Sequence, residues 1–509
     1  MNDEKQMNNE KHMNDKKQMN NEKHMNDKKQ MNDEKQSQDI DIDDKWNPEE
    51  RTRKIWDQLI KNPIRQDVLK LAWPILIELL LGSLFGMIDM MMLGWIADKA
   101  LSAASVAAVG ITNQPMFIGL SLAQALNVGG TAMIARYVGA KQPHKVDSVL
   151  KHVILLNIFV LAIPLATFGL VFTEEIMRFM GAEADTISAG STYFKVIMIG
   201  YLFQSFNMSI TAALRGIGET KAPMRINLRV NFLNVIGNAV LIYGLLFFPA
   251  LGVTGAGVST AFSHVVASVL MVRFVTRKDS PLKLDLQKKF KYNKIVIQNL
   301  IKVGVPASLE SLALRIGVMM FVRIVASLGT VVYASHQIAL SILGLSFQPG
   351  QAFGIAASSM VGRSLGAQNL KKAELYAKET RKIGSIISTG MALLFFFFGP
   401  QIVSLYTTDP VIIDNASMAL KIIALVQPFQ SSQLILAGAL RGAGDTFWPL
   451  VATFIGVFGF RVLVAYLLVK VLGMGLMGAW IAVLIDQLIR WVFVYGRFRT
   501  NKWKYIRIR

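Results

Sequence analysis

A few carboxylates interrupt the long apolar stretches of this chain, and they are the side chains there that are best able to do chemistry. Asp89 lies deep in the first apolar stretch. A charged residue at the centre of a membrane helix costs about 2.5–3.5 kcal/mol on insertion scales. We therefore interpret Asp89 either as a carrier of a proton or cation, or as a structural hydrogen-bond acceptor for a neighbouring helix.

Two amides stand four residues apart in a later apolar stretch. Asn234 and Asn238 therefore lie on one face of a helix. Their oxygens are suitable neutral ligands for Na⁺, and their N–H groups are suitable donors to Asp89. The spacing indicates either a cation site or a hydrogen-bonded setting that tunes the proton affinity of Asp89.

A second acidic candidate follows a proline. Glu310 comes four residues after Pro306, where a helix is expected to open and free backbone carbonyls. We weigh two alternatives for Glu310, namely cation binding and an ion pair with Arg315 or Arg323. Glu78 follows a proline at the same spacing and is open to the same two alternatives.

Long membrane helices are needed to position these side chains. The chain is 52% hydrophobic and 17% charged, whereas soluble proteins average about 25% charged residues. After Lys70 it becomes a series of apolar stretches long enough to cross roughly 30 Å of hydrocarbon. We predict an all-α membrane protein with twelve transmembrane helices, at about 71–96, 106–135, 150–173, 189–213, 223–247, 254–275, 297–328, 334–362, 382–405, 413–439, 447–471 and 476–496.

The N-terminal region has a different composition. Residues 1–36 read as six polar hexapeptides (MNDEKQ, MNNEKH, MNDKKQ, MNNEKH, MNDKKQ, MNDEKQ), and we predict that residues 1–46 form a disordered tail. Residues 47–70 are predicted to be an amphipathic segment at the membrane interface. The chain has no cysteine, and no nucleotide, metal or catalytic motif stands out. We therefore expect no cofactor and no enzymatic activity.

The net charge of +20 is distributed as a topology signal. Basic residues gather in alternate loops, whereas one opposite loop is acidic, with Glu174 and Glu175. The positive-inside rule then places both termini in the cytoplasm of a multi-pass cell-membrane protein, and nucleic-acid binding is not expected. The basic loops lie at about 136–151, 215–225, 273–294, 363–382 and 497–509.

The two halves of the chain repeat one another. Segment 213–223 (ALRGIGETKAP) recurs at 439–449 (ALRGAGDTFWP), and 136–140 (RYVGA) recurs at 363–367 (RSLGA). Six spans per half give parallel repeats with a cleft between them, which is typical of alternating access. We predict an N-terminal six-helix bundle at 71–275, a basic linker at 276–296, a C-terminal six-helix bundle at 297–500 and a basic tail at 501–509.

At these motifs the chain resembles the multidrug and toxic compound extrusion (MATE) family. The resemblance extends over about 68–499 and includes 88–94 (IDMMMLG), 335–349 (SHQIALSILGLSFQP) and 353–363 (FGIAASSMVGR). It implies two six-helix bundles arranged as a V around a central cleft. It also implies antiport of cationic amphipathic compounds against H⁺ or Na⁺.

The resemblance assigns roles to several residues and marks departures from the family pattern. Asp89 matches the first-helix aspartate, Thr260 matches a threonine near the same site, and Glu310 resembles a seventh-helix glutamate that binds cations in some branches. Asn238 stands where several branches have an aspartate. Gln430 stands near the position of a tenth-helix aspartate, so the cation site of the second half is expected to be incomplete.

We expect a monomeric antiporter that exports small organic cations, drugs or toxins across a lipid bilayer, with H⁺ or Na⁺ as the coupling ion. One alternative is a lipid-linked oligosaccharide flippase of a related fold, which is expected to carry more basic residues in the cleft. The other is a membrane receptor or scaffold that signals through the tail. The cleft candidates are Gln204, Asn207, Gln337, Gln351 and Gln430.

Overall fold

The computed structural model describes residues 62–245, 247–282, 284 and 290–506. The predicted tail at 1–46, residues 47–61 of the predicted interfacial segment, residues 283 and 285–289 of the linker and residues 507–509 lie outside the described residues. Within the described ranges, the regular secondary structure is helical throughout.

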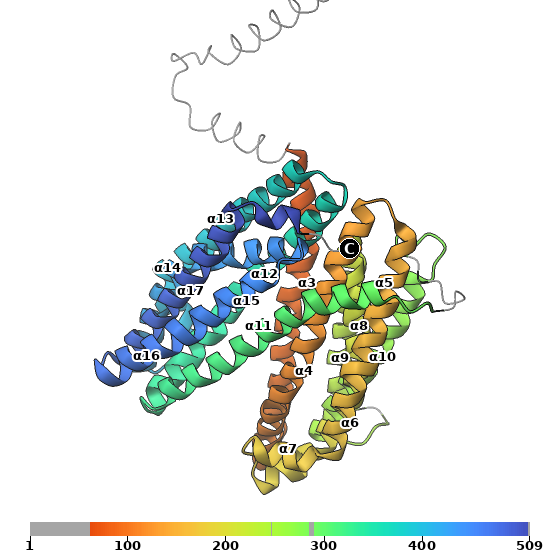
Figure 1. Cartoon of the computed structure of the whole chain (residues 1–509). Coiled ribbons are helices and arrows are strands. Elements are labelled where there is room, and N and C mark those ends of the chain that lie inside the picture. The colour runs from red at the N-terminus through yellow and green to blue at the C-terminus, as the bar shows by residue number, and fades with distance from the viewer. Residues whose placement is uncertain (1–61, 246, 283, 285–289, 507–509) are drawn as a thin grey trace, which may run out of the picture. The chain divides into compact units, whose positions relative to one another are not determined.

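Six long helical segments make up the first half of the described chain (Figure 1). The third of them is α-helical at both ends and π-helical in the middle, and a short helix, α7, follows it. The elements are α3 (Pro63–Gly94), α4 (Lys99–Gly139), α5 (Pro143–Leu155) with η1 (Leu156–Ala162) and α6 (Ile163–Val171), α7 (Thr173–Phe179), α8 (Ala184–Ile217), α9 (Lys221–Tyr243) and α10 (Gly252–Val275).

The second half repeats this arrangement. Here π-helical turns interrupt the fifth segment, whereas in the first half they interrupt the third. A short 3-10 helix, η4, follows the last span. The elements are α11 (Lys294–Ala326), α12 (Thr330–Gly366), α13 (Leu370–Ser404), α14 (Pro410–Gly442), α15 (Phe447–Phe454) with η2 (Ile455–Val462), α16 (Leu463–Tyr466) and η3 (Leu467–Val471), α17 (Gly475–Arg499) and η4 (Lys502–Tyr505).

Local sequence signals explain where several of these helices begin. Asn62 caps α3 by accepting a 3.0 Å hydrogen bond from the Ile64 N–H, and Pro63 occupies the first helical position. Asp98 caps α4 in the same way. The end of α8 is set by Gly218, whose φ of 87° is a left-handed conformation that favours glycine.

Eleven of the described helical segments are long and apolar enough to cross a membrane. The twelfth, α11, has 33 residues and carries several charged side chains, among them Lys302, Glu310 and Arg315. The chain is thus an all-α membrane protein built from two six-helix bundles, and this prediction is confirmed. Figure 1 shows that the helices of the two halves meet near the start of α3 and diverge toward α7 and α16.

The first helix of each half is shared between the two bundles. The early part of α3, including Val68 and Ile75, packs into a core made with α12, α13, α14 and α17, whereas Met92 packs with its own half. In the same manner Val296 and Leu300 of α11 pack with α4, α5, α8 and α10, whereas Phe321 packs with the second half. The two halves therefore hold each other through exchanged helix ends.

The bundles make close backbone contact where α4 and α12 end. A methyl group added to Gly139 would lie 1.9 Å from the carbonyl oxygen of Arg363, and one added to Gly366 would lie 2.1 Å from the carbonyl oxygen of Arg136. Arg136 Nη2 also donates a 2.7 Å hydrogen bond to the carbonyl oxygen of Ala443. We call this end of the body, which holds the basic loops 136–151, 215–225 and 363–382, the basic end.

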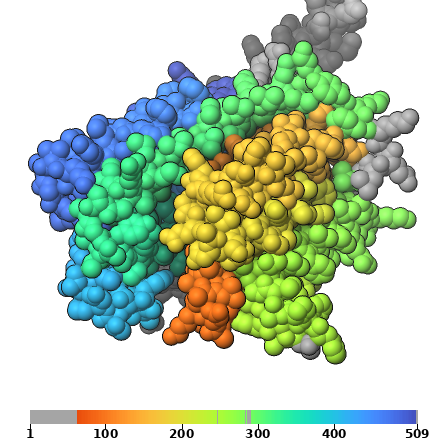
Figure 2. Space-filling view, turned by 90° about the horizontal axis from the view of Figure 1, so that it is seen from below, coloured from red at the N-terminus to blue at the C-terminus, as the bar shows by residue number. Residues whose placement is uncertain are grey.

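At the opposite end the helices of the two halves lie apart. Figure 2 views the body from that end, with the surface of the second half (teal to blue) on one side and that of the first half (orange to light green) on the other. Hydrogen bonds that join the halves farther from the basic end come from mid-helix residues, as between Arg315 Nε and Ser121 Oγ at 2.8 Å and between Gln348 Nε2 and Ser83 Oγ at 2.9 Å.

Candidate functional site in the first bundle

Asp89 of α3 lies against α9. Asn238 Nδ2 donates a 2.8 Å hydrogen bond to Asp89 Oδ1. When the Asn234 amide is oriented with its nitrogen toward α3, Nδ2 lies 3.3 Å from Oδ1 and 3.2 Å from Oδ2 of the same carboxylate. Two amide donors on one face of α9 thus hold the carboxylate through charge-assisted hydrogen bonds.

The same amide extends the site to α10. In this orientation Asn234 Oδ1 accepts from the hydroxyl and the backbone N–H of Thr260, each at 3.2 Å. The Ser259 hydroxyl donates to the backbone carbonyl of Asn234 at 2.9 Å. The structure therefore brings together Asp89, Asn234, Asn238 and Thr260, which the sequence analysis proposed as one site on α3, α9 and α10.

One oxygen beside Asp89 has no hydrogen bond. Asn238 is 1% exposed, and its Oδ1 has no hydrogen-bond partner among the described residues. A buried acceptor without a donor is costly, and a carboxylate beside a free amide oxygen is a suitable donor set for a proton or a monovalent cation. The described residues hold no group of three or more histidine, aspartate or glutamate side chains that could bind a metal ion.

Glu78 belongs to a different cluster. Its Oε1 lies 2.9 Å from Arg215 Nη2 and accepts a 2.6 Å hydrogen bond from Asn227 Nδ2. Arg215 is the arginine of the repeated segment 213–223, and Asn227 lies one turn beyond that segment's end. The cluster therefore joins α3 to the connection between α8 and α9.

Glu310 occupies the matching cluster of the second half. Its Oε1 lies 2.6 Å from Arg441 Nη2 and 3.3 Å from the donating hydroxyl of Thr453. Arg441 holds the same place in segment 439–449 that Arg215 holds in 213–223. Each repeat thus uses one glutamate, the arginine of its LRGxG motif and one polar residue of the next helix to fasten its first helix.

The expected partners of Glu310 were wrong. Arg315 contacts Ser121 instead, and its guanidinium lies 5.2 Å from the centre of the Phe117 ring. The reason is helical periodicity, because residues five apart on a helix point about 140° away from each other. Arg323 lies about 20 Å farther along α11, beyond the reach of Glu310.

The second half carries no carboxylate in the place of Asp89. Besides Glu310, it buries Asp486, which pairs with Arg461 at 2.6 Å, and neither of these two side chains is more than 9% exposed. Gln430 is 1% exposed, and neither Oε1 nor Nε2 of its side chain has a hydrogen-bond partner among the described residues. The polar residues of the two bundles are therefore arranged differently.

The predicted cleft residues do not form one group. Asn207 is buried between α8 and α10, where it donates to the His264 carbonyl at 2.9 Å and accepts from Ser268. Gln337 and Gln351 are exposed, and Gln204 is half-buried. Asn207, like Gln430, is covered by protein in this conformation and has no free face to offer a ligand.

Comparison with known families explains this architecture. The family model MatE matches residues 74–240 and 306–467, one segment on each repeat and together more than half of the chain. The chain belongs to the MATE family. MATE proteins are transporters, so the chain is a multi-pass membrane transporter of a multidrug efflux family and not an enzyme.

Relatives of this MATE protein extend over most of its length. It is 31% identical over 442 residues to a probable multidrug resistance protein NorM from Thermotoga maritima, which spans 87% of this chain and 93% of the relative. It is 28% identical over 383 residues to the multidrug resistance protein NorM of Vibrio cholerae, which spans 74% of this chain and 82% of the relative.

Solved MATE structures share the fold. A MOP superfamily transporter from Pyrococcus furiosus superposes with a TM-score of 0.80 at 25% identity, over 88% of this chain and 98% of the other. A MATE family transporter in an outward-facing conformation gives the same TM-score at 24% identity, with the same coverage.

The ion pairs of Arg215 with Glu78 and of Arg441 with Glu310 were not predicted from the sequence. The signal was present, because the glutamate four residues after a proline and the arginine of the LRGxG motif both recur in the two repeats. Two features that recur together are candidates for mutual contact. This reasoning would have identified Arg441, rather than Arg315, as the partner of Glu310.

Proposed function

We propose that the chain is a cation-coupled antiporter that exports small organic cations, with H⁺ or Na⁺ bound at Asp89 as the coupling ion. The observation that carries the proposal is the carboxylate of Asp89, held by Asn238 and Asn234 beside an amide oxygen that lacks a donor. Asp89 is the one acid of this site, and its hydrogen-bond partners are neutral. One added positive charge therefore neutralises the site.

One coupling charge is sufficient to drive useful export. A single charge that crosses a 100 mV potential gains about 2.3 kcal/mol, which corresponds to nearly two decades of concentration ratio. Coupling further requires that the ion and the exported cation oppose each other's binding. A carboxylate that either one can neutralise meets this requirement.

The conformation supports alternating access. The bundles are in contact at the basic end through Gly139 and Gly366 and diverge at the other end. We assign the basic end to the cytoplasm by the positive-inside rule, with both termini on that side of the cell membrane. The structure is then an outward-facing state, in which Asp89 is loaded from outside.

The charge pattern between the bundles favours a binding position in the first bundle. Arg315 of α11 points to α4 and is only partly buried, so a positively charged substrate is repelled from that side. Asp89 is the attractive group on the other side. We expect a small organic cation to bind near α3 and α9, in a transporter that works as a monomer within the lipid bilayer.

The test is gradient-driven efflux of ethidium from proteoliposomes, under an imposed pH gradient and separately under an imposed Na⁺ gradient. We expect one gradient to drive efflux by the wild type and Asp89→Asn to lose it. The matched control is Asp414→Asn, which removes an exposed carboxylate of α14 and should keep the wild-type rate.

Failure of both gradients to move a panel of organic cations would contradict the proposal. In that case the flippase alternative should be tested by the movement of a fluorescent lipid-linked oligosaccharide across the same vesicles. Efflux that persists unchanged in Asp89→Asn would leave an exporter but would remove Asp89 as the coupling site.

A further inference from the structure

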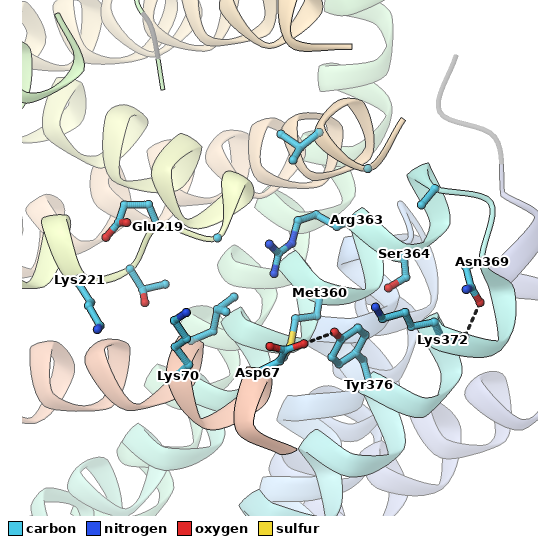
Figure 3. Close-up of a pocket in the computed structure, with 16 residues that line it drawn as sticks. Asp67, Lys70, Glu219, Lys221, Met360, Arg363, Ser364, Asn369, Lys372 and Tyr376 are labelled. Atoms are coloured by element: carbon cyan, nitrogen blue, oxygen red, sulfur yellow. Dashed lines mark hydrogen bonds between the residues drawn. The ribbon is translucent and has the colours of Figure 1, made fainter. Parts of the chain in front are cut away.

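A cavity of about 690 Å³ opens at the basic end, beside the contact between the bundles (Figure 3). Its walls come from α3, α4 and the α8–α9 connection of the first half, and from α12 and α13 of the second half. Ligand pockets commonly measure about 300–1,000 Å³. The cavity is therefore large enough for an organic ligand and lies far along α3 from Asp89.

Positive charge prevails in this cavity. Two side chains are acidic, Asp67 and Glu219, and four are basic and come from four different helices. The basic side chains are Lys70 of α3, Lys221 of α9, Arg363 of α12 and Lys372 of α13.

Each of the two acids accepts a hydrogen bond from an uncharged donor. The hydroxyl of Tyr376 donates a 2.6 Å hydrogen bond to Asp67 Oδ2, and the backbone N–H of Ala222 donates a 2.9 Å hydrogen bond to Glu219 Oε1. Neither acid makes an ion pair with a cavity cation in the described part of the chain. Each acid thus has a neutral hydrogen-bond donor on one oxygen, and the charge of Asp67 partly offsets that of Arg363.

The cations have no close counter-charge, although Lys372 Nζ lies 5.6 Å from the centre of the Tyr376 ring. No ion pair is formed by Lys70, Lys221, Arg363 or Lys372 within the described ranges. Arg363 Nε is buried with no hydrogen-bond partner there, and its guanidinium lies against Gly218. Figure 3 shows Arg363, Lys70 and Lys372 on different sides of the cavity, with Asp67 and Met360 between them.

Two long helices begin at the cavity wall. Thr220 precedes α9 and makes no side-chain cap, and Asn369 caps α13 by accepting a 2.9 Å hydrogen bond from the Lys372 N–H. The N-terminus of a helix carries a partial positive charge and N–H donors that favour phosphate. Glu219 caps α9 and Asn369 caps α13, so the basic side chains rather than the helix ends supply the positive charge that is free in the cavity.

We propose that this cavity binds a phosphate ester, either the headgroup of an anionic phospholipid or a soluble phosphorylated compound. Guanidinium and ammonium groups on several helices recognise phosphate through charge-assisted hydrogen bonds. The inference goes beyond the export function, because no exported cation would bind among these residues. A ligand that contacts both halves also stabilises the closed basic end, since it binds this state better than one with the halves apart.

Native mass spectrometry of the full-length protein in detergent tests the proposal, since it counts bound ligands and identifies them by mass. The probes are ATP as a soluble phosphate ester, dioleoyl phosphatidylglycerol as an anionic lipid and dioleoyl phosphatidylcholine as a zwitterionic lipid. We expect one ATP or one phosphatidylglycerol per protein. In Lys70→Gln/Lys372→Gln the dissociation constant should rise at least about tenfold, because each lost charge-assisted hydrogen bond is worth at least that factor.

The control variant is Lys371→Gln, which removes an exposed positive charge from the same helix but outside the cavity. It should bind the probe as the wild type does. Binding of ATP identifies a soluble ligand, and binding of phosphatidylglycerol alone identifies a lipid headgroup; either supports the site when the double variant loses it. Absence of binding by both anionic probes, or equal losses in Lys371→Gln and the double variant, would overturn the proposal. No step of this test depends on transport.

Discussion

At the scale of the residue, the molecule separates two kinds of acid within its membrane helices: Asp89 is half-buried, whereas Glu78 and Glu310 are buried. Asp89 has only neutral partners, whereas Glu78 and Glu310 each contact an arginine at 2.9 Å or less. A buried carboxylate held by a permanent positive charge is already neutralised, so it has little tendency to bind another cation. An acid held by amides keeps its negative charge available, and this difference is the reason to assign coupling to Asp89.

The pair of Glu310 and Arg441 gives a prediction about stability. Arg441→Leu leaves Glu310 buried without a counter-charge and should lower the free energy of unfolding by about 3–5 kcal/mol. The double variant Glu310→Leu/Arg441→Leu should recover most of the loss, since it removes both charges. The measurement is thermal unfolding of the purified variants, followed by tryptophan fluorescence.

The equivalent changes in the first repeat, Arg215→Leu and Glu78→Leu/Arg215→Leu, provide an internal comparison. Both repeats should give the same order of stabilities. Equal melting temperatures for Arg441→Leu and the wild type would show that the ion pair does not hold α11 in place.

At the scale of the element, the two proline-containing helices connect the halves. In α3 and α11 the part before the glutamate packs largely in the opposite bundle, and the far end packs with its own bundle. Pro74 and Pro306 each remove one backbone hydrogen bond near this change of partners. A bend at these positions is therefore the least costly way for the bundles to change their mutual angle.

The close contact at the basic end leads to a second prediction. A methyl group on Gly366 would overlap the Arg136 carbonyl oxygen, so Gly366→Ala should disfavour the closed basic end. The chain has no cysteine, which allows Ser359→Cys to report on this contact, because Ser359 is 1% exposed and donates to the Gly216 carbonyl across the halves. Maleimide labelling of Ser359→Cys should be several-fold faster when combined with Gly366→Ala.

Gly344→Ala is the matched control, because it lies on the same helix and an added methyl group would contact nothing within 4 Å. It should leave the labelling rate unchanged. If Gly366→Ala labels no faster than this control, the contact does not determine which end of the transporter is closed.

Sequence was sufficient for the fold and for one cluster of side chains. The lengths of the apolar stretches and the repeated segments predicted two six-helix bundles, and the four-residue spacing of Asn234 and Asn238 placed both amides toward one neighbour. The partners of Glu310 were not predictable from its own helix, because the ion pair joins α11 to α14. The burial of Gln430 also depends on how α14 is rotated against α12 and α13, which its sequence does not specify because positions 430–433 are all polar.

At the scale of the whole molecule, the loops predict the orientation in the membrane. The basic end carries most of the lysines and arginines between the spans, and the short helix α7 at the other end carries Glu174 and Glu175. Charge asymmetry of this kind sets topology. The outward-facing state that we propose requires the basic end to face the cytoplasm, since such a state is closed on that side.

Single cysteines test this orientation in intact cells. A membrane-impermeant maleimide should label Glu175→Cys directly, because the residue is exposed at the end opposite the basic end. Lys371→Cys, which is equally exposed at the basic end, should be labelled only after the membrane is permeabilised. The reverse pattern would place the closed end outside and would contradict the export direction.

The central claim is that one carboxylate binds the coupling ion and the exported cation in alternation. It is tested most directly by measuring H⁺ or Na⁺ release when ethidium is added to the purified protein in weakly buffered solution. We predict release of about one coupling ion per protein from the wild type, and none from Asp89→Asn. Equal release from both proteins, or ethidium binding that is independent of pH and Na⁺, would contradict the claim.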